Sequence, residues 1–197
     1  MWPWEHVLFA YVFYSVYVRL HYRFAPDEWP IVALVLGSFF PDVIDKPLAW
    51  QFSLFETGWG IAHSVFFVVP FCVAVYATAK TYGDSEIGIA FGFGYVCHLV
   101  GDVFPASLSR GRPYLDPILW PLGNPRTSGD HGSFFDGVSS LFLEYAAQLH
   151  SLEVTPVFAL QLGSIIAGLT LWLYDGRPGL RLLTWPIRRA VTTPPQR

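Results

Sequence analysis

The chain has 197 residues, of which 53% are hydrophobic, 18% are aromatic and only 14% are charged. Soluble globular proteins carry about 25% charged residues, so this composition argues against a water-soluble domain and, with its long apolar runs, favours an integral membrane protein. The formal net charge of −3 is too small to indicate a nucleic-acid partner. Cys72 and Cys97 lie in apolar runs, which favours buried packing residues over a disulfide or a soft-metal site.

The apolar runs predict an all-α, polytopic helix bundle that forms a single integral membrane domain over residues 1–197. About five spans are expected, near residues 4–20, 31–45, 60–79, 87–104 and 154–174. A full crossing takes about 20 residues, but the most apolar part of the second span is bounded by Pro30 and Pro41. That span therefore crosses only if the segment with Asp42 and Asp45 lies at membrane depth or if the bilayer thins locally. The first span has no basic start and no clear cleavage site, so it is expected to stay in the mature protein.

A long connection, residues 105–153, separates the last two spans. Its first half is rich in proline, glycine and serine and predicts an irregular loop. Its second half has helical periodicity and predicts an amphipathic helix that lies in the membrane interface or caps the bundle. The expected apolar face consists of Phe134, Val138, Leu141, Tyr145 and Leu149, and the polar face of Asp136, Ser140, Glu144 and Gln148. The basic tail, residues 175–197, is typical of a segment beside a membrane surface.

The distribution of lysine and arginine predicts the orientation of a multi-pass protein in the cell membrane. With the N-terminus outside and the C-terminus cytoplasmic, the cytoplasmic basic residues are Arg19, Arg23, Lys80, Arg177, Arg181, Arg188, Arg189 and Arg197. The external ones are Lys46, Arg110, Arg112 and Arg126. The excess of basic residues on the cytoplasmic side agrees with the positive-inside rule.

Histidine and aspartate residues occur at span ends that alternate in direction. His6 begins the first span, Asp42 and Asp45 end the second, His63 begins the third, and His98 and Asp102 end the fourth. Because successive antiparallel spans bring the end of one helix beside the start of the next, all of these residues are expected at the same membrane face.

A convergent set of imidazoles and carboxylates predicts a divalent metal site. His98 and Asp102 are four residues apart and share a helix face, and ionisable groups inside a span are usually functional. Imidazole and carboxylate ligands favour zinc, with manganese or iron as alternatives. Simpler interpretations remain open: His98 and Asp102 could form a hydrogen bond, and Asp42 and Asp45 could end a helix and pair with Lys46.

The order and spacing of these residues resemble a known family. His6, Pro41-Asp42-x-x-Asp45, His63-Ser64, Gly94-Tyr95-x-x-His98-x-x-x-Asp102 and Pro117-Ile118-Leu119-Trp120-Pro121 are similar to the YdjM-type membrane-bound metal-dependent hydrolases. More distantly, "HLVGDVFP" resembles the zinc-binding helix of zinc-dependent phospholipases C. The resemblance implies that Asp42 or Asp45, His63, His98 and Asp102 hold one metal ion, with His6 and Asp102 near a second.

Two stretches depart from the family pattern. "TGWGIAHS" lacks the expected His-Arg and has Ala62 where the family has threonine, and "PDVIDK" has Lys46 in place of a histidine. His131, in the long connection, could supply a missing ligand.

These observations predict a metal-dependent hydrolase that acts at the membrane surface. The metal would activate water, and whichever of Asp42 and Asp45 is not a ligand would act as general base. Arg110 and Arg112 could neutralise a substrate phosphate, or they could be ordinary solvated loop residues. The expected substrate is a membrane lipid or another membrane-associated ester, most plausibly a phosphoester. The alternatives are a non-catalytic scaffold that uses the metal to tie helix ends together and an ion or metal transporter.

Overall fold

The computed structural model describes residues 1–123, 133–151 and 153–182. The described elements are all helical, as predicted, and they begin and end as follows: α1 (Pro3–Tyr22), α2 (Glu28–Trp50), the 3₁₀ helix η1 (Ile61–His63), α3 (Val65–Thr81), α4 (Ser85–Arg110), the 3₁₀ helix η2 (Asp116–Leu119), α5 (Phe134–Ser151) and α6 (Pro156–Tyr174).

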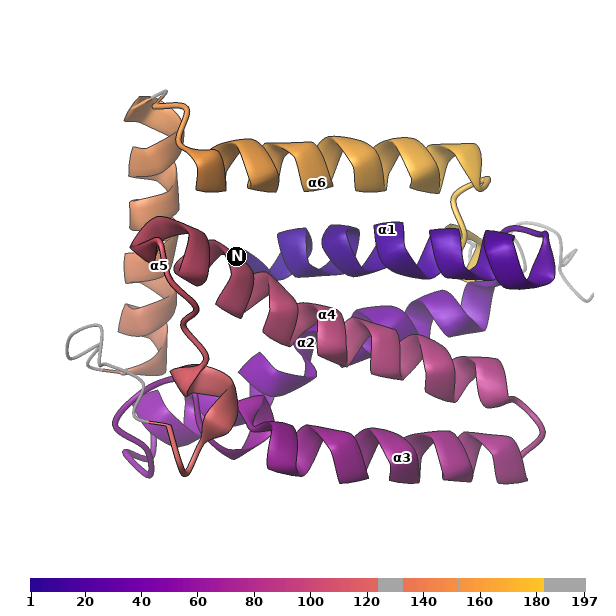
Figure 1. Cartoon of the computed structure of the whole chain (residues 1–197), viewed down its shortest axis with the longest axis horizontal. Helices are drawn as coiled ribbons and strands as arrows, with labels where there is room; N and C mark the ends of the chain where they lie inside the picture. Colours follow the sequence, from indigo (N-terminus) through magenta and orange to yellow (C-terminus); the bar gives the residue numbers. More distant parts are fainter. Residues whose placement is uncertain (124–132, 152, 183–197) are drawn as a thin grey trace, which may run out of the picture.

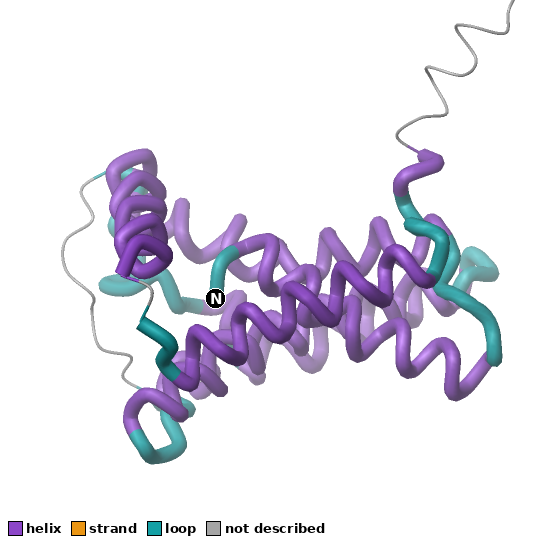
Figure 2. Tube along the Cα trace, turned by 90° about the horizontal axis from the view of Figure 1, so that it is seen from above, coloured by secondary structure: helices purple, strands orange, loops and turns teal. Residues whose placement is uncertain are grey.

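The five longest apolar segments form a bundle whose helices run along one axis. Figure 1 shows α1, α3 and α6 pointing in one direction and α2 and α4 pointing in the other, with α5 lying across one end. The turns and loops gather at the two ends of the bundle (Figure 2). The start of α1, the ends of α2 and α4 and the start of α3 therefore share the end that α5 covers.

The most extensive helix contact joins α2 to α4. Two glycines allow it: a Cβ atom on Gly37 would lie 2.2 Å from the carbonyl oxygen of Phe91, and a Cβ atom on Gly94 would lie 2.2 Å from that of Leu34. Contacts this short are sterically forbidden, so only glycine permits the two backbones to approach so closely. Small residues at such positions are typical of helix interfaces in membranes.

Helix α2 is longer than the second predicted span. It begins at Glu28 and continues through Pro41 and Pro47 to Trp50, whereas Pro41 was expected to end the most apolar part of the span. A proline inside a helix removes one backbone hydrogen bond and strains the preceding turn, but packing against α4 compensates over the length of the helix. With 23 residues the helix is about 34 Å long. This exceeds the length of about 20 residues that a full crossing needs. Similarly, α4 continues through Pro105 to Arg110, beyond the predicted limit of residue 104.

Two of the described helices, α4 and α6, are long and apolar enough to cross a membrane, and α3 is a shorter apolar helix. Only 11% of the apolar window of α6 is buried inside the protein. Leu162, Ile166 and Leu173 are among its exposed side chains. An apolar helix with this much exposed surface is suited to a lipid environment rather than to water. Five crossings remain a prediction, since α1 and α2 do not meet the same test of apolar length.

Helix α6 is fastened to α1 by polar contacts near both of its ends. Near its start, Gln161 donates to Oε2 of the buried Glu5 over 2.9 Å. Just after its end, Asp175 accepts hydrogen bonds from Tyr11 and Ser15, each over 2.6 Å, and forms an ion pair with Arg19. These contacts lie at the two ends of the bundle, with apolar packing between them.

The predicted amphipathic helix is present as α5. Its Phe134 lies beside Trp50 of α2, with ring centroids 6.1 Å apart, and its Tyr145 lies 4.8 Å from Trp2 by the same measure. The predicted apolar face is only partly covered, because Val138 and Leu149 are each 43% exposed. Helix α5 is thus held across the bundle end by aromatic contacts and keeps a substantial exposed apolar surface.

We predict that Gly94→Ala destabilises the protein by about 1–3 kcal/mol, because the added methyl group overpacks the contact between α2 and α4. Gly92→Ala is the matched control on the same helix, since a Cβ atom there meets nothing within 4 Å. It should be neutral or stabilising, because alanine favours helix more than glycine does. Unfolding of both variants in detergent measures the difference, and equal effects would contradict the packing argument.

We also predict that single cysteines at Glu56 and Pro113 lie on the opposite membrane face from one at Tyr82. All three positions are exposed, and the helix directions place Tyr82 at the far end of the bundle (Figure 1). In a background without Cys72 and Cys97, an impermeant maleimide should label positions 56 and 113 in intact cells and position 82 only after permeabilisation. Labelling of positions 56 and 113 from opposite sides would refute the arrangement of α2 and α4, whereas complete reversal would refute only the orientation.

Candidate metal centre

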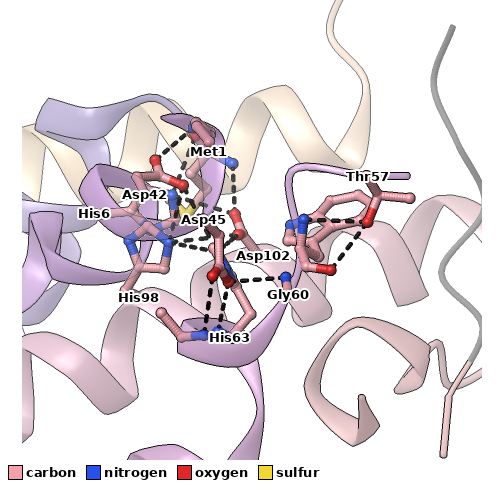
Figure 3. A network of polar contacts seen from close by, with 12 residues as sticks. Met1, His6, Asp42, Asp45, Thr57, Gly60, His63, His98 and Asp102 are labelled. Atoms are coloured by element: carbon pink, nitrogen blue, oxygen red, sulfur yellow. Dashed lines mark hydrogen bonds and ion pairs between the residues drawn. The ribbon is translucent and has the colours of Figure 1, made fainter. Parts of the chain in front are cut away.

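Four side chains from three elements converge at the end of the bundle beneath α5: Asp42 of α2, His63 of η1, and His98 and Asp102 of α4 (Figure 3). The Nε2 atoms of His63 and His98 are 3.3 Å apart. Oδ1 of Asp42 lies 3.6 Å from each of these nitrogens. Oδ2 of Asp102 lies 3.7 Å from Nε2 of His63 and 3.5 Å from Nε2 of His98. The expected convergence at one bundle end is therefore present in the geometry.

The separations around the two histidines are close to those in a tetrahedral metal site. With zinc–ligand bonds of about 2.0–2.1 Å, the ligand atoms of a regular tetrahedron lie about 3.3 Å apart, and each histidine Nε2 lies 3.3–3.7 Å from the other Nε2 and from both carboxylate oxygens. The candidate ligand atoms of Asp42, His63 and His98 all lie within 4.8 Å of one another, as do those of His6, His98 and Asp102. The residue types and their spacing therefore fit a divalent metal.

Both histidines are held with Nε2 directed at the centre. Nδ1 of His63 lies 2.7 Å from Oδ2 of Asp45, and Nδ1 of His98 lies 2.7 Å from the carbonyl oxygen of Ser38. Because neither oxygen can donate, each Nδ1 must carry the proton, and in the neutral ring this leaves the lone pair of Nε2 free to bind a metal. Such outer partners are usual for histidine ligands of metals.

Asp45 lies behind His63 rather than at the centre. Its side chain is completely buried, and it accepts backbone hydrogen bonds from Gly60, Ala62 and His63 over 2.8–3.0 Å. Together with Nδ1 of His63, these donors engage both carboxylate oxygens. Of the two aspartates that the sequence offered as ligand or base, Asp42 therefore faces the cluster, while Asp45 fixes η1 and orients His63.

His6 contacts the cluster from α1. Its Nε2 lies 3.2 Å from Oδ1 of Asp102 and 3.1 Å from the carbonyl oxygen of Met1, and its ring stacks on that of His98 with centroids 4.0 Å apart. The oxygen of Asp102 that it touches is not the one that faces His63 and His98. His6 can thus hold Asp102 in place.

Lys46 places a cationic side chain beside the cluster. Its Nζ lies 2.5 Å from Oδ2 of Asp42, one helical turn away. A cavity of about 180 Å³ adjoins this pair, lined by Met1, Asp42, Lys46, Trp50, Thr57, Gly58, Trp59, Asp102 and Leu141. In the sequence, Lys46 is indicated only as a partner of the nearby carboxylates, although its position four residues after Asp42 places it on the same helix face.

The two arginines expected to bind a phosphate lie elsewhere. Arg110 and Arg112 are both exposed, and neither lines the cavity next to the cluster. The guanidinium of Arg110 instead lies 3.8 Å from the centroid of the Tyr114 ring. His131, the further candidate ligand, lies outside the described residues.

The surrounding carboxylates control the protonation of His63 in the metal-free protein. His63 is buried and lies 2.7–3.7 Å from carboxylate oxygens of Asp42, Asp45 and Asp102, whose negative charge favours its protonated form. A metal ion that binds there must displace a proton from Nε2 of that form.

Comparison with known proteins places the chain in a family. The family model described as YdjM inner membrane protein matches residues 1–178. No curated protein and no solved structure shows significant similarity to the chain. The suspected family is thus confirmed, whereas the more distant similarity to zinc-dependent phospholipases C is not supported.

We predict that Asp45→Asn destabilises the metal-free protein by about 1–3 kcal/mol, because the new NH2 group is a donor and leaves at least one of the buried donors around the carboxylate without an acceptor. Unfolding in detergent with a chelator present measures this effect without a contribution from metal. The control is Asp84→Asn at the exposed N-cap of α4, where asparagine caps as well as aspartate and the change should stay within about 0.5 kcal/mol. Equal stability of the two variants would show that Asp45 does not hold η1.

Proposed function

The chain belongs to the YdjM inner membrane protein family, and from its buried cluster we propose that it is a multi-pass, membrane-bound, metal-dependent hydrolase. The observation that carries this proposal is the convergence of Nε2 of His63, Nε2 of His98 and Oδ2 of Asp102, which lie 3.3–3.7 Å apart beside a polar cavity that Asp42 also lines. The proposed substrate is a phosphoester or another lipid-linked ester at the membrane surface.

Zinc is the metal that we propose, with manganese or iron as alternatives, because the candidate ligands are imidazole and carboxylate groups. Bound in the cluster, such an ion would supply Lewis-acid chemistry: it lowers the pKa of a water molecule and polarises the scissile group.

We assign His63, His98 and Asp102 as the ligands. The two histidines are oriented by Asp45 and by the carbonyl oxygen of Ser38, and Asp102 is held through Oδ1 by His6. Three protein ligands are what catalytic zinc sites use, because a position must stay open for water or substrate.

We assign Asp42 as the general base. Oδ1 of Asp42 faces the cluster, while Oδ2 faces Lys46. Since the Lys46 side chain is 22% exposed, a proton accepted by Asp42 has a path to water. The ammonium group of Lys46 is also placed to attract an anionic substrate into the cavity, a role that the sequence suggested for Arg110 and Arg112.

The proposed orientation places the cluster at the outer face of the membrane. Among the described residues, Lys46, Arg110 and Arg112 lie toward the cluster end, while Arg19, Arg23, Lys80, Arg177 and Arg181 lie toward the other end. This distribution supports a cytoplasmic C-terminus under the positive-inside rule.

One observation favours a second candidate function. If Asp42 binds the metal as well, the four ligands close the coordination sphere, as in structural zinc sites. The cluster would then tie α2, η1 and α4 together without catalysis. The behaviour of Asp42 variants separates the two candidates.

We predict that the purified protein binds about one divalent ion per chain, most plausibly zinc, and that His98→Ala loses both metal and activity. Asp42→Asn should keep the metal and lower turnover by about 10²–10⁴-fold, the usual contribution of a general base. Elemental analysis and hydrolysis assays on phospholipids, soluble phosphodiesters and carboxylic esters, with added zinc or manganese, measure both effects. His21→Ala is the control, because His21 lies at the other end of α1.

Metal-free wild-type protein, or unchanged metal content in His98→Ala, would refute the metal site. Fully metal-loaded protein that cleaves none of these esters would favour the scaffold, as would loss of metal from Asp42→Asn.

A further inference from the structure

The polar cavity beside the cluster continues into an apolar groove. This groove has a volume of about 300 Å³ and is lined by Met1, Trp2, Pro3, Phe39, Asp42, Val43, Lys46, Pro47, Trp50, Phe134, Val138 and Leu141. It shares Met1, Asp42, Lys46, Trp50 and Leu141 with the polar cavity. A molecule that enters the polar cavity can therefore extend directly into the groove.

The groove runs between α2 and α5. Phe39, Val43 and Pro47 line it from α2, and Phe134 and Val138 line it from α5. It opens to the surroundings, because Val43 is 66% exposed and Val138 is 43% exposed. Since α5 lies across the bundle end (Figure 1), the groove follows the protein surface near the membrane interface.

We propose that this groove holds one acyl chain of a membrane phospholipid while the phosphate of the same lipid occupies the polar cavity beside Lys46. The proposal rests on the proposed function, and it names the substrate class as an intact lipid rather than a soluble phosphoester. The two compartments match the two parts of such a molecule: a cation stands at the polar end, and aliphatic and aromatic side chains form the rest.

The lining argues for a lipid chain and against a peptide. Among the described residues that line the groove, Asp42 and Lys46 have the only charged side chains, both lie at the end shared with the polar cavity, and they pair with each other. A peptide in the groove would bring backbone N–H and C=O groups that need partners away from water, and the aliphatic side chains along α2 and α5 offer none. An acyl chain needs none.

The groove can be blocked without altering the polar cavity. Val138 lines the groove but not the cavity, so Val138→Trp fills the apolar part and leaves Asp42 and Lys46 unchanged. Leu143→Trp is the matched control on the same helix, because Leu143 is 66% exposed and lines neither compartment. Both variants should unfold at the same temperature as the wild type.

The test is native mass spectrometry of the full chain in detergent with added dioleoyl phosphatidic acid. Wild type and Leu143→Trp should retain one lipid to the same extent. Val138→Trp should retain at least about tenfold less, the loss expected when about two methylene groups leave an apolar site. In hydrolysis assays, Val138→Trp should lose activity toward the lipid and keep wild-type activity toward a soluble phosphodiester.

Equal lipid retention in wild type and Val138→Trp would contradict the proposal that the groove holds an acyl chain. An equal loss of lipid in Leu143→Trp would contradict it as well, whatever the enzyme assays show. If Val138→Trp selectively loses the lipid but the wild-type protein hydrolyses none of the substrates, acyl-chain binding in the groove is supported and the proposed hydrolase activity is contradicted. The two proposals therefore fail separately.

Discussion

The close approach of α2 and α4 at Gly37 and Gly94 is the constraint on which the rest of the structure depends. Any side chain at either position would collide with the backbone of the other helix, so the two helices are locked in one register. That register places Asp42, just over a turn beyond Gly37, opposite His98 and Asp102, which are one and two turns beyond Gly94. Ser38 is held in the same contact, and its carbonyl oxygen orients His98. The positions of the candidate metal ligands on α2 and α4 thus depend on a backbone contact to which none of their own side chains contributes.

The gathering of histidine and aspartate at one bundle end could be predicted because it depends only on alternating helix direction. The sequence could not predict which of the two aspartates, Asp42 or Asp45, faces the centre of the cluster. Asp42 and Asp45 are three residues apart and lie on neighbouring parts of one helix face. Their roles differ because the turn before α3 directs three backbone N–H groups at Asp45. The conformation of that turn depends on tertiary contacts, such as the hydrogen bond from Tyr95 to the carbonyl oxygen of Ala62, which no local pattern reveals.

Tertiary contacts also explain the other points at which the structure differs from the sequence-based predictions. The helix-breaking tendency of Pro41 is real, but it is a local preference, and the long contact with α4 overrides it. Arg110 and Arg112 follow Asp102 closely in sequence, yet α4 continues to Arg110 and carries them away from the cavity that Lys46 enters. The amphipathic period of residues 134–149 predicted a helix correctly, whereas its covered side is set by where Trp2 and Trp50 stand. The sequence period thus predicts where a helix lies in the chain, whereas tertiary contacts determine which of its side chains are covered.

The two polar connections between α1 and α6 also limit how this chain can change in evolution. The same number of residues separates Glu5 from Arg19 as separates Gln161 from Asp175, and the two helices run in parallel. An insertion or deletion of one residue in α6 would rotate everything beyond it by about 100° and bring only one of the two connections into place. Substitutions on the exposed face of α6 should therefore be common among relatives, while its length between these two residues should be invariant.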